Sequence, residues 1–346
     1  MKIPKKIKRN NKNKGSISEL RQDLVTGEWI VIAQVRAKRP SDYQRSERSV
    51  LDASLDKCPF ENPQASGNAD PILLYKKADD SDWSLQVIPN KYPAVDHSGK
   101  CGIVNKHGPY SIQDGKGFHE VIVPRDHDKH FAVYSSEEAR EIIQAYQERY
   151  KSLKEEECVK YISIFHNHGK EAGASLHHPH SQLVAIPVMP SDVYRSLQGS
   201  SRYYDENQEC AHCTIIKWEQ EQEERIIFEN DKFIAYCPFA SRTAFEIQIF
   251  PKEHQSNFEE LSEDAFTELG DALRTSLNKL HDVLDDPAYN FFIHTAPVGK
   301  KKKYPNYHWH VEIMPKTAIW AGFELGTGIE ISAIEPKEAA KYLREG

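Results

Sequence analysis

The amino-acid sequence predicts an α+β protein made of two similar halves, each an antiparallel sheet with one packed helix. Two long segments carry apolar residues at every third or fourth position, the pattern of an amphipathic helix. Short runs of strand-forming residues precede and follow each of these segments. The connections between the runs are short, which favours antiparallel pairing because parallel strands need long crossovers.

The elements of the first half can be placed along the chain. Expected strands cover residues 29–33, 83–88, 118–123, 161–165 and 183–186. Ser135 and Glu138 have the spacing of a capping box, so a helix is expected to begin there and to continue through Leu153. Residues 41–80 are rich in Ser, Asp, Asn and Pro and are expected to form a loop.

The second half has the same order of elements. Expected strands cover residues 245–250 and 289–294. Between them a helix is expected to open at residues 261–264 and to extend to Leu284. Like its counterpart in the first half, this helix has a continuous apolar stripe.

Landmarks in the two halves are separated by nearly constant distances along the sequence. Tyr161 and Tyr289 lie 128 residues apart, while the motifs His178-x-His180 and His308-x-His310 lie 130 residues apart. Such a slow drift predicts an internal repeat. We therefore expect three regions, namely a basic disordered tail (1–15), an N-terminal half (16–190) and a C-terminal half (191–346).

Composition limits the class of protein. The chain has 346 residues, enough for two domains of ordinary size, and a net charge of −7, which does not suggest a nucleic-acid-binding protein. No apolar run approaches the length of a membrane span, and no apolar segment follows the charged N-terminus. We therefore expect a cytoplasmic protein with no membrane or nucleic-acid partner. Its six cysteines do not suggest a disulfide framework in such a protein.

The most informative motif is His178-Pro179-His180-Ser181-Gln182. Alternation along an extended segment puts His178, His180 and Gln182 on one face. Pro179 has no N–H to donate, so an edge or bulged strand is expected there. Imidazoles beside a carboxamide can act on a phosphoryl group, because imidazole is nucleophilic near neutral pH. A surface cluster of histidines without a function, or a purely structural metal site, would explain the same residues.

The repeat also predicts two metal sites. The second would combine a Cys-x-x-Cys pair with two histidines, a tetrahedral zinc set with a structural role: Cys210, Cys213, His254 and His308. The first would have a glutamate in place of one cysteine: Cys58, Glu61, His127 and His178. A carboxylate binds zinc more weakly in such a set, so the alternative is that the glutamate points to solvent and no metal binds.

In each His-x-His motif the first histidine is an expected metal ligand and the second is not. These second histidines are His180 and His310. Ser181 and Gln182 follow His180 and offer hydrogen bonds to a phosphoryl oxygen, whereas Glu312 stands in the matching position after His310. We therefore expect the N-terminal half to be catalytic and the C-terminal half to support it. In this interpretation His310 is a buried or interface histidine.

Taken together, these motifs resemble the galactose-1-phosphate uridylyltransferase family of the histidine-triad superfamily. The resemblance extends over roughly residues 19–345 and is carried by Arg36-Ala37-Lys38-Arg39-Pro40, Cys58-Pro59-Phe60, Asn90-Lys91-Tyr92-Pro93, Gly173-Ala174-Ser175, His178-Pro179-His180-Ser181-Gln182 and Gly322-Phe323-Glu324. It implies two histidine-triad-like halves in each chain, zinc as the cofactor and a homodimer.

The resemblance further implies a ping-pong nucleotidyl transfer from a nucleotide sugar to a hexose 1-phosphate. His180 matches the nucleophile that attacks the α-phosphorus and carries the nucleotide, and Gln182 would orient the phosphoryl oxygens. The implied substrate-binding residues are Asn90, Asn167 and Ser175 for the nucleoside or its phosphates, Arg36 and Arg39 for the phosphate region, and Phe323 and Glu324 for the hexose in the partner subunit's site. On local sequence alone, the two arginines would equally suit a solvated sheet edge.

Three features depart from the uridylyltransferase pattern. Glu61 replaces the second cysteine of the first metal motif, and Ser181 replaces a glycine. Residues 322–328 are closer to the ADP-glucose phosphorylase branch, in which AMP replaces UMP and phosphate can be the acceptor. ADP-glucose phosphorylase activity is therefore the alternative. Two alternatives are more distant. One is a hydrolase of the same superfamily, and the other is a non-enzymatic nucleotide-binding module stabilised by zinc.

Overall fold

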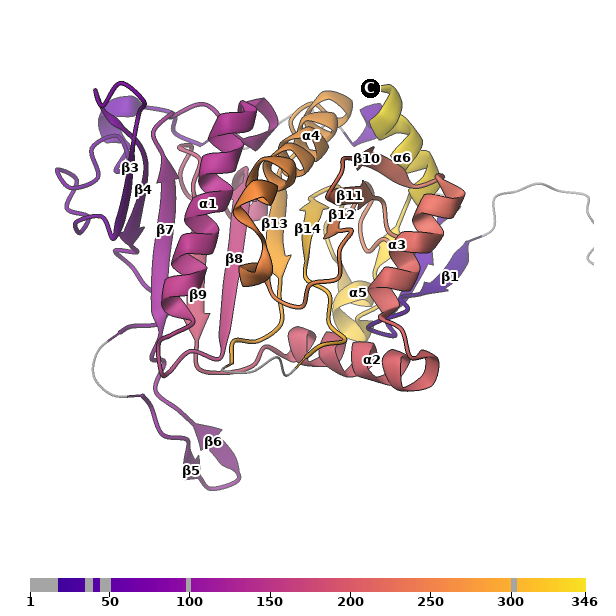
Figure 1. Cartoon of the computed structure of the whole chain (residues 1–346). Coiled ribbons are helices and arrows are strands. Elements are labelled where there is room, and N and C mark those ends of the chain that lie inside the picture. Colours follow the sequence, from indigo (N-terminus) through magenta and orange to yellow (C-terminus); the bar gives the residue numbers. More distant parts are fainter. Residues whose placement is uncertain (1–17, 35–39, 44–50, 98–100, 300–303) are drawn as a thin grey trace, which may run out of the picture.

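The computed structural model describes residues 18–34, 40–43, 51–97, 101–299 and 304–346. Its centre is one sheet of ten strands, with two long helices lying side by side across one face (Figure 1). Every neighbouring pair of strands in this sheet is antiparallel. The predicted α+β class with antiparallel sheets is therefore confirmed.

The two halves contribute their elements to this sheet in the same order along the chain. The N-terminal half contains β3 (Leu73–Lys76), β4 (Trp83–Pro89), β7 (Phe118–Pro124), α1 (Ser136–Leu153), β8 (Tyr161–His168) and β9 (Ser181–Ile186). The C-terminal half contains β10 (Ile226–Glu229), β11 (Phe233–Tyr236), β12 (Ile247–Pro251), α4 (Phe266–Leu284), β13 (Tyr289–His294) and β14 (His310–Pro315).

The spatial order of the strands is also the same in both halves. The sheet runs β3-β4-β7-β9-β8 and continues as β13-β14-β12-β11-β10, so one half is the reverse of the other across the seam. At the seam, β8 pairs with β13, with Phe291 opposite His166 and Ile293 opposite Ile164. This is the arrangement that an internal repeat predicts, but the two halves share one continuous sheet instead of forming a separate sheet each.

Helix α1 begins with the predicted capping box. The Ser135 side chain accepts a hydrogen bond from the Glu138 N–H at 3.2 Å, and Glu138 Oε2 accepts one from the Ser135 N–H at 2.8 Å. The second long helix starts later than expected. A short 3-10 turn covers Glu263–Ala265, and α4 begins at Phe266.

The two long helices pack closely on each other and on the sheet. Ile162 and Ile164 of β8 are fully buried in the core beneath them, together with Leu183 of β9. Gly270 of α4 permits the close approach, because a Cβ at this position would lie 3.1 Å from the backbone of Ala139 in α1. Residues that alternate with this apolar set, Gln182 among them, point to the opposite face of the sheet.

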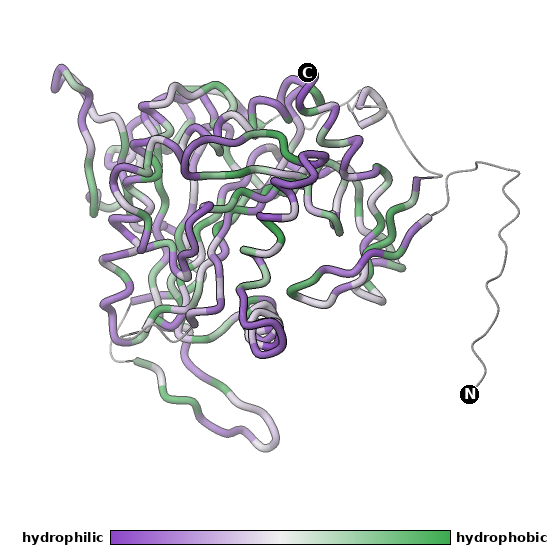
Figure 2. The backbone as a smooth tube through the Cα atoms, turned by 45° about the vertical axis from the view of Figure 1, so that its right-hand side comes forward, coloured by the Kyte–Doolittle hydropathy of each residue, from purple (hydrophilic) through white to green (hydrophobic). Residues whose placement is uncertain are grey.

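Several elements were not anticipated from the sequence. Residues 41–80 are not a continuous loop, because β3 lies within them. The further unanticipated elements are β1 (Glu19–Gln22), β5 (Asn105–His107), β6 (Tyr110–Ile112), α2 (Ser191–Asn207), α3 (Ala211–Gln222), α5 (Gly322–Thr327), β15 (Ile331–Ser332) and α6 (Pro336–Glu345). Strand β2 (Trp29–Ile32), by contrast, is the strand expected at residues 29–33. The hairpin β5–β6 stands away from the body of the molecule, as Figures 1 and 2 show from two directions.

Two features bear on the expectations from composition. Cys101 and Cys158 form a disulfide, although the sequence did not suggest disulfide bonding. In the part of the chain that the structure describes, no helix has the length and apolar character needed to traverse a bilayer. The predicted tail, residues 1–15, lies outside the described residues.

Candidate active site

His180 lies in the segment that leads into β9, and its ring is buried. Its Nδ1 atom is 3.0 Å from the carbonyl oxygen of His178, which can only accept, so Nδ1 carries the proton. The lone pair is therefore on Nε2. Burial lowers the pKa of His180, and the hydrogen bond to the His178 carbonyl opposes this only in part. A neutral imidazole with a free Nε2 is the form that acts as a nucleophile.

The carboxamide of Gln182 is held by a residue that sequence inspection missed, His119 of β7. The backbone N–H of Ala94 donates to His119 Nδ1 at 3.1 Å, which leaves the proton on Nε2. His119 Nε2 then donates to Gln182 Oε1 at 2.9 Å. The Asn90 side chain lies 3.0 Å from the same nitrogen. With its oxygen occupied, Gln182 has its amide N–H groups available for a phosphoryl oxygen.

Ser181 does not have the expected role. Alternation along β9 turns its side chain to the helix-covered face, away from Gln182. There its hydroxyl contacts Tyr146 of α1 and lies 3.0 Å from Nδ1 of the buried His166. The expectation that Ser181 offers a hydrogen bond to a phosphoryl oxygen is therefore wrong. Pro179 also differs from expectation, because β9 starts after it and is a central strand.

The other predicted substrate-binding residues fall in three places. Asn167, near the end of β8, accepts a hydrogen bond from Asn290 at 2.7 Å, and Ser175 is exposed in the loop before His178. Phe323 and Glu324 lie in α5. In Figure 1 the strands β8, β13 and β14 lie between β9 and this helix. Within one chain, α5 and β9 are therefore on opposite sides of these three strands (Figure 1). Arg36 and Arg39 lie outside the described residues.

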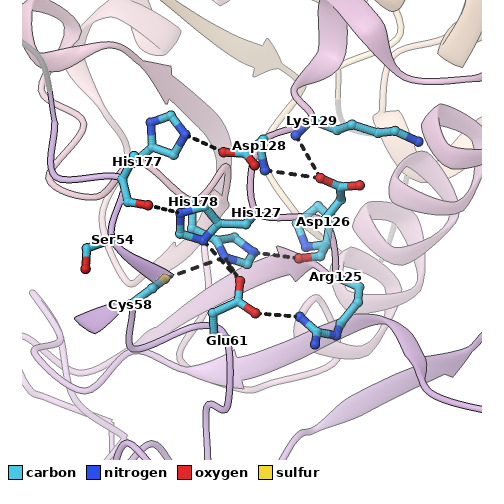
Figure 3. Close-up of polar contacts among 12 residues, drawn as sticks. Ser54, Cys58, Glu61, Arg125, Asp126, His127, Asp128, Lys129, His177 and His178 are labelled. Carbon is cyan, nitrogen blue, oxygen red and sulfur yellow. Dashed lines mark hydrogen bonds and ion pairs between the residues drawn. The ribbon is translucent and has the colours of Figure 1, made fainter. Parts of the chain in front are cut away.

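The four residues predicted for the first metal site come together (Figure 3). Glu61 Oε1 is 3.0 Å from His127 Nδ1 and 3.4 Å from His178 Nδ1, and Cys58 Sγ is 3.6 Å from the latter. The Nε2 atoms of both histidines donate to backbone carbonyls, those of Ala53 and Pro124. Both Nδ1 lone pairs therefore face the thiol and the carboxylate, which is the donor arrangement that a metal ion needs.

Arg125 fixes the glutamate of this site and was also missed in the sequence. Its Nη1 donates to Glu61 Oε2 at 2.9 Å, and its Nε donates to Asp82 at 2.8 Å. Burial would raise the pKa of Glu61, but the hydrogen bond and charge of Arg125 outweigh it and lower that pKa. Burial lowers the pKa of His178 to about 4. Glu61 is thus ionised and directed at the histidines and not at solvent.

The second predicted site has the same construction with two cysteines. Cys213 Sγ is 3.4 Å from His254 Nδ1 and 3.6 Å from His308 Nδ1. The Nε2 atoms again donate to carbonyls, from His254 to Pro305 and from His308 to Pro251. The hydrogen bond from Cys213 lowers the pKa of Cys210, the fourth member of the group. The ligand set therefore suits zinc.

The C-terminal half repeats the His180 arrangement without its chemistry. His310 is buried, as expected, and its Nδ1 donates to the His308 carbonyl at 3.2 Å. At the position of Gln182 stands Glu312, which pairs with Arg242 and accepts from His294 at 3.1 Å. A carboxylate there repels a phosphoryl oxygen, which leaves the N-terminal half as the half suited to phosphoryl chemistry.

Comparison with known families decides the classification. The model described as galactose-1-phosphate uridyl transferase, N-terminal domain, matches residues 8–190. The chain belongs to the galactose-1-phosphate uridylyltransferase family. This confirms the resemblance seen in the sequence and the assignment of the chain as a transferase-type enzyme. A second model, described as domain of unknown function DUF4921, matches residues 114–344.

Individual relatives represent both branches considered above. An ADP-glucose phosphorylase from Arabidopsis thaliana is 34% identical over 94% of this chain and 92% of its own. A galactose-1-phosphate uridylyltransferase from Thermotoga maritima is 29% identical over 94% and 98%. Among solved structures, the Arabidopsis thaliana ADP-glucose phosphorylase with bound ADP-glucose has a TM-score of 0.78 at 31% identity, covering 95% of this chain and 99% of that one.

Proposed function

We propose that this protein is a nucleotidyltransferase that moves a nucleotide from a nucleotide sugar to a phosphate acceptor through a covalent intermediate on His180. One observation carries the proposal. The His178 carbonyl holds the Nδ1 proton of His180, so the buried ring presents an unprotonated Nε2 beside the carboxamide of Gln182. That is the combination of nucleophile and phosphoryl-binding donor that group transfer through histidine requires.

The reaction has two displacements at one phosphorus atom. In the first, His180 Nε2 attacks the α-phosphorus, the N–P bond forms, and the bond to the bridging oxygen breaks, releasing hexose 1-phosphate. In the second, an oxygen of the acceptor phosphate attacks the same phosphorus and the N–P bond breaks. The amide N–H groups of Gln182 donate to the phosphoryl oxygens as their negative charge rises. Covalent transfer of this kind replaces one difficult displacement by two easier ones.

The leading substrates are UDP-glucose and a hexose 1-phosphate acceptor, as in the uridylyltransferases of the family. A second candidate has a specific observation in its favour. The Arabidopsis thaliana relative named ADP-glucose phosphorylase shares 34% identity with this chain over nearly its whole length. For that activity the transferred group is AMP and the acceptor is inorganic phosphate. Both candidates use the same two steps at His180 and differ in the base and in the acceptor.

Zinc is the cofactor we propose for both metal sites, in a structural role. Cys210, Cys213, His254 and His308 form a closed set of sulfur and nitrogen ligands, and the donor atoms lie within 4.8 Å of one another. The first site is linked to the nucleophile through one residue, because the ring of His178 belongs to the metal site while its carbonyl orients His180. Metal analysis of the purified protein would measure the zinc content of each site in single-ligand variants.

We also propose the division of labour and the quaternary structure. The N-terminal half (16–190) is the catalytic half, and the C-terminal half (191–346), with Glu312 at the position of Gln182, supports it. The chain works as a homodimer in the cytoplasm, with residues of α5 completing the hexose site of the partner subunit. The separation of α5 from β9 within one chain supports this arrangement (Figure 1).

The covalent intermediate gives a direct test. The protein is incubated with UDP-glucose or ADP-glucose labelled in the α-phosphate, and acid-labile label bound to protein is measured. We expect an adduct with one of the two substrates, and none in His180→Ala. His310→Ala is a matched control, because His310 occupies the equivalent position in the other half and should leave the adduct unchanged.

The outcomes separate the alternatives. Turnover with galactose 1-phosphate or with inorganic phosphate as acceptor distinguishes the uridylyltransferase from the phosphorylase. Release of free UMP or AMP without a sugar acceptor would indicate the hydrolase. Absence of an adduct with both nucleotide sugars, in a protein whose circular dichroism shows a folded state, would contradict the proposal and favour a nucleotide-binding module.

A further inference from the structure

A cluster of three histidines and one aspartate lies on the helix-covered face of the sheet, away from His180. His168 is the last residue of β8, and His130 directly precedes the 3-10 helix Phe131–Val133. His281 is in the last turn of α4, and Asp286 follows that helix by two residues. The N-terminal half supplies two members and the C-terminal half supplies the other two, so the cluster spans the seam between β8 and β13.

One carboxylate oxygen is the centre of this cluster. Asp286 Oδ1 lies 2.8 Å from His168 Nε2, 3.2 Å from His281 Nδ1 and 3.9 Å from His130 Nε2. The His130 ring centre is 4.6 Å from that of His168 and 5.4 Å from that of His281. Two ligands of one tetrahedral ion at about 2 Å lie about 3.3 Å apart. The donor atoms of His130, His281 and Asp286 all lie within 4.8 Å of one another, a spacing at which one ion could be bound.

The protonation states suit a metal ion as well. Burial lowers the pKa of His130 to about 4, so its imidazole is neutral at physiological pH. Its Nδ1 is buried and has no hydrogen-bond partner among the residues that the structure describes. Burial would raise the pKa of Asp286, but the hydrogen bond and charge of His168 outweigh it and lower that pKa. A neutral imidazole and an ionised carboxylate are the forms that bind metals.

We propose that His130, His281 and Asp286 form a third metal site, which binds a divalent transition-metal ion of the zinc and cobalt type and joins the two halves of the sheet. The donor atoms of these three residues lie within 4.8 Å of one another. Two imidazoles among three donors favour such ions over magnesium and calcium, which prefer oxygen ligands. His168 holds the carboxylate by its hydrogen bond and so orients the third ligand.

This site is distinct from the centres described above. None of its three ligands belongs to either cysteine-containing group. His168 alternates with Asn167 along β8, so it faces the helices while Asn167 faces the side of Gln182. The two tetrads each contain a thiol and are expected to hold zinc tightly, whereas this site has three protein ligands and leaves a coordination position open. We therefore expect weaker, exchangeable binding.

The test uses protein whose two cysteine-containing sites have been filled with zinc. Cobalt chloride is then titrated in, and binding is followed by calorimetry and by visible absorption of the bound ion. Asp286→Asn removes the central charge, and because asparagine tolerates the left-handed backbone at φ +55° it should not disturb the fold. Asp285→Asn is the matched control, since this neighbour is also left-handed, at φ +58°, and lies outside the cluster. His281→Ala removes a second ligand independently.

We expect the wild type and Asp285→Asn to bind one cobalt ion, and the affinity to fall about 100-fold or more in Asp286→Asn and His281→Ala. Cobalt should raise the melting temperature of the wild type and of Asp285→Asn but not of the other two variants, since a ligand that binds the folded state stabilises it. Equal isotherms in all four proteins would show adsorption to surface histidines and would overturn the proposal. So would a wild type with no saturable binding. All four proteins should form the nucleotidyl adduct, because none of these changes touches the His180 site.

Discussion

At the scale of single residues, His178 connects the two kinds of site in the N-terminal half. Its ring faces Cys58 and Glu61, while its carbonyl accepts the Nδ1 proton of His180. Metal binding at the first site would therefore fix the backbone that selects the tautomer of the nucleophile. The same pair of contacts recurs at His308 and His310, where no phosphoryl-binding carboxamide follows. The same backbone contact thus sets the tautomer in both halves, and we propose that Gln182 makes the N-terminal half the reactive one.

His119 should matter because it orients Gln182 and not because it touches the nucleotide. We expect Gln182→Ala to lower kcat about 100-fold, the typical cost of removing one donor to a developing negative charge. His119→Ala should lower kcat less, about tenfold, with KM nearly unchanged. Steady-state kinetics on both variants, with the competent nucleotide sugar, would measure these effects.

A double variant separates positioning from a general loss of structure. If His119 acts only through Gln182, the variant carrying both substitutions should be no slower than Gln182→Ala alone. Multiplicative losses would instead show that His119 contributes independently. Because the N–H of Ala94 donates to the His119 side chain, His119→Ala also removes that contact, and limited proteolysis would show whether the segment around Ala94 stays ordered in this variant.

The pH dependence of adduct formation should report the environment of His180. The nucleophile must be neutral, and burial lowers its pKa, so the neutral form persists below the ordinary histidine value of about 6.5. The rate of adduct formation should therefore be constant down to pH 6.5 or below and should decline only as the pH falls through the lowered pKa. Quench-flow measurements at constant ionic strength would show this limb. An acid limb near or above about pH 6.5 would contradict the structure.

At the scale of elements, the parts that the sequence predicted are those with strong periodicity. The helix from Ser136 to Leu153 and the strands β4, β7, β8, β9 and β13 all follow from amphipathic patterns and from a capping box. Helices α2 and α3 were missed because their polar composition hides a narrow apolar face, and β3 because turn-forming residues surround it. The continuous seam could not be predicted, since periodicity assigns faces to strands but does not say which strands pair.

Because local patterns do not reveal which strands pair, the sequence revealed only those site residues that belong to a motif with a characteristic spacing. Cys58, Cys210 and the His-x-His motifs were found because metal chemistry has characteristic spacings along the chain. His119 and Arg125 were missed because their partners lie 63 and 64 residues away, on other elements. Only the register between β7 and β9, which no local pattern contains, brings His119 to Gln182.

The contact between α1 and α4 gives a prediction at this scale. Gly270 faces the backbone of Ala139 and Arg140, so a large side chain there must push the helices apart. We expect Gly270→Leu to lower the free energy of unfolding by about 1–3 kcal/mol, the usual cost of overpacking. Urea denaturation would measure it. Gly326→Ala is the control, since a Cβ there meets open space and should change stability by less than about 1 kcal/mol.

At the scale of the whole molecule, the two halves have the same order of elements within one sheet but differ at the position of Gln182. The C-terminal copy retains a metal tetrad and the buried His310, but Glu312 and Arg242 occupy the position where a phosphoryl group would bind. It contributes instead the seam strand β13 and helix α5. The proposed catalysis by the N-terminal half and support by the C-terminal half agrees with the separation of α5 from β9 within a single chain (Figure 1).

That separation leads to a prediction about subunit complementation. His180→Ala should lack the nucleophile, and a variant with Phe323→Ala and Glu324→Ala should lack the hexose contacts, so each alone should be inactive in sugar-phosphate turnover. If α5 completes the partner's site, a mixed dimer has one site with an intact His180 and an intact α5. Random reassortment of equal amounts makes half of the dimers mixed, so activity should recover to about a quarter of the wild-type value.

A chain that carries all three substitutions provides the control, because mixing it with either variant cannot assemble a complete site. Mass photometry would establish that the mixed preparations are dimers. Adduct formation in the Phe323→Ala/Glu324→Ala variant should be slower but still detectable at high nucleotide-sugar concentration, since His180 is intact while the hexose of the nucleotide sugar loses its contacts. Absence of recovery in confirmed mixed dimers would mean that α5 serves its own chain. The distance between α5 and β9 would then have to close by a movement within one subunit.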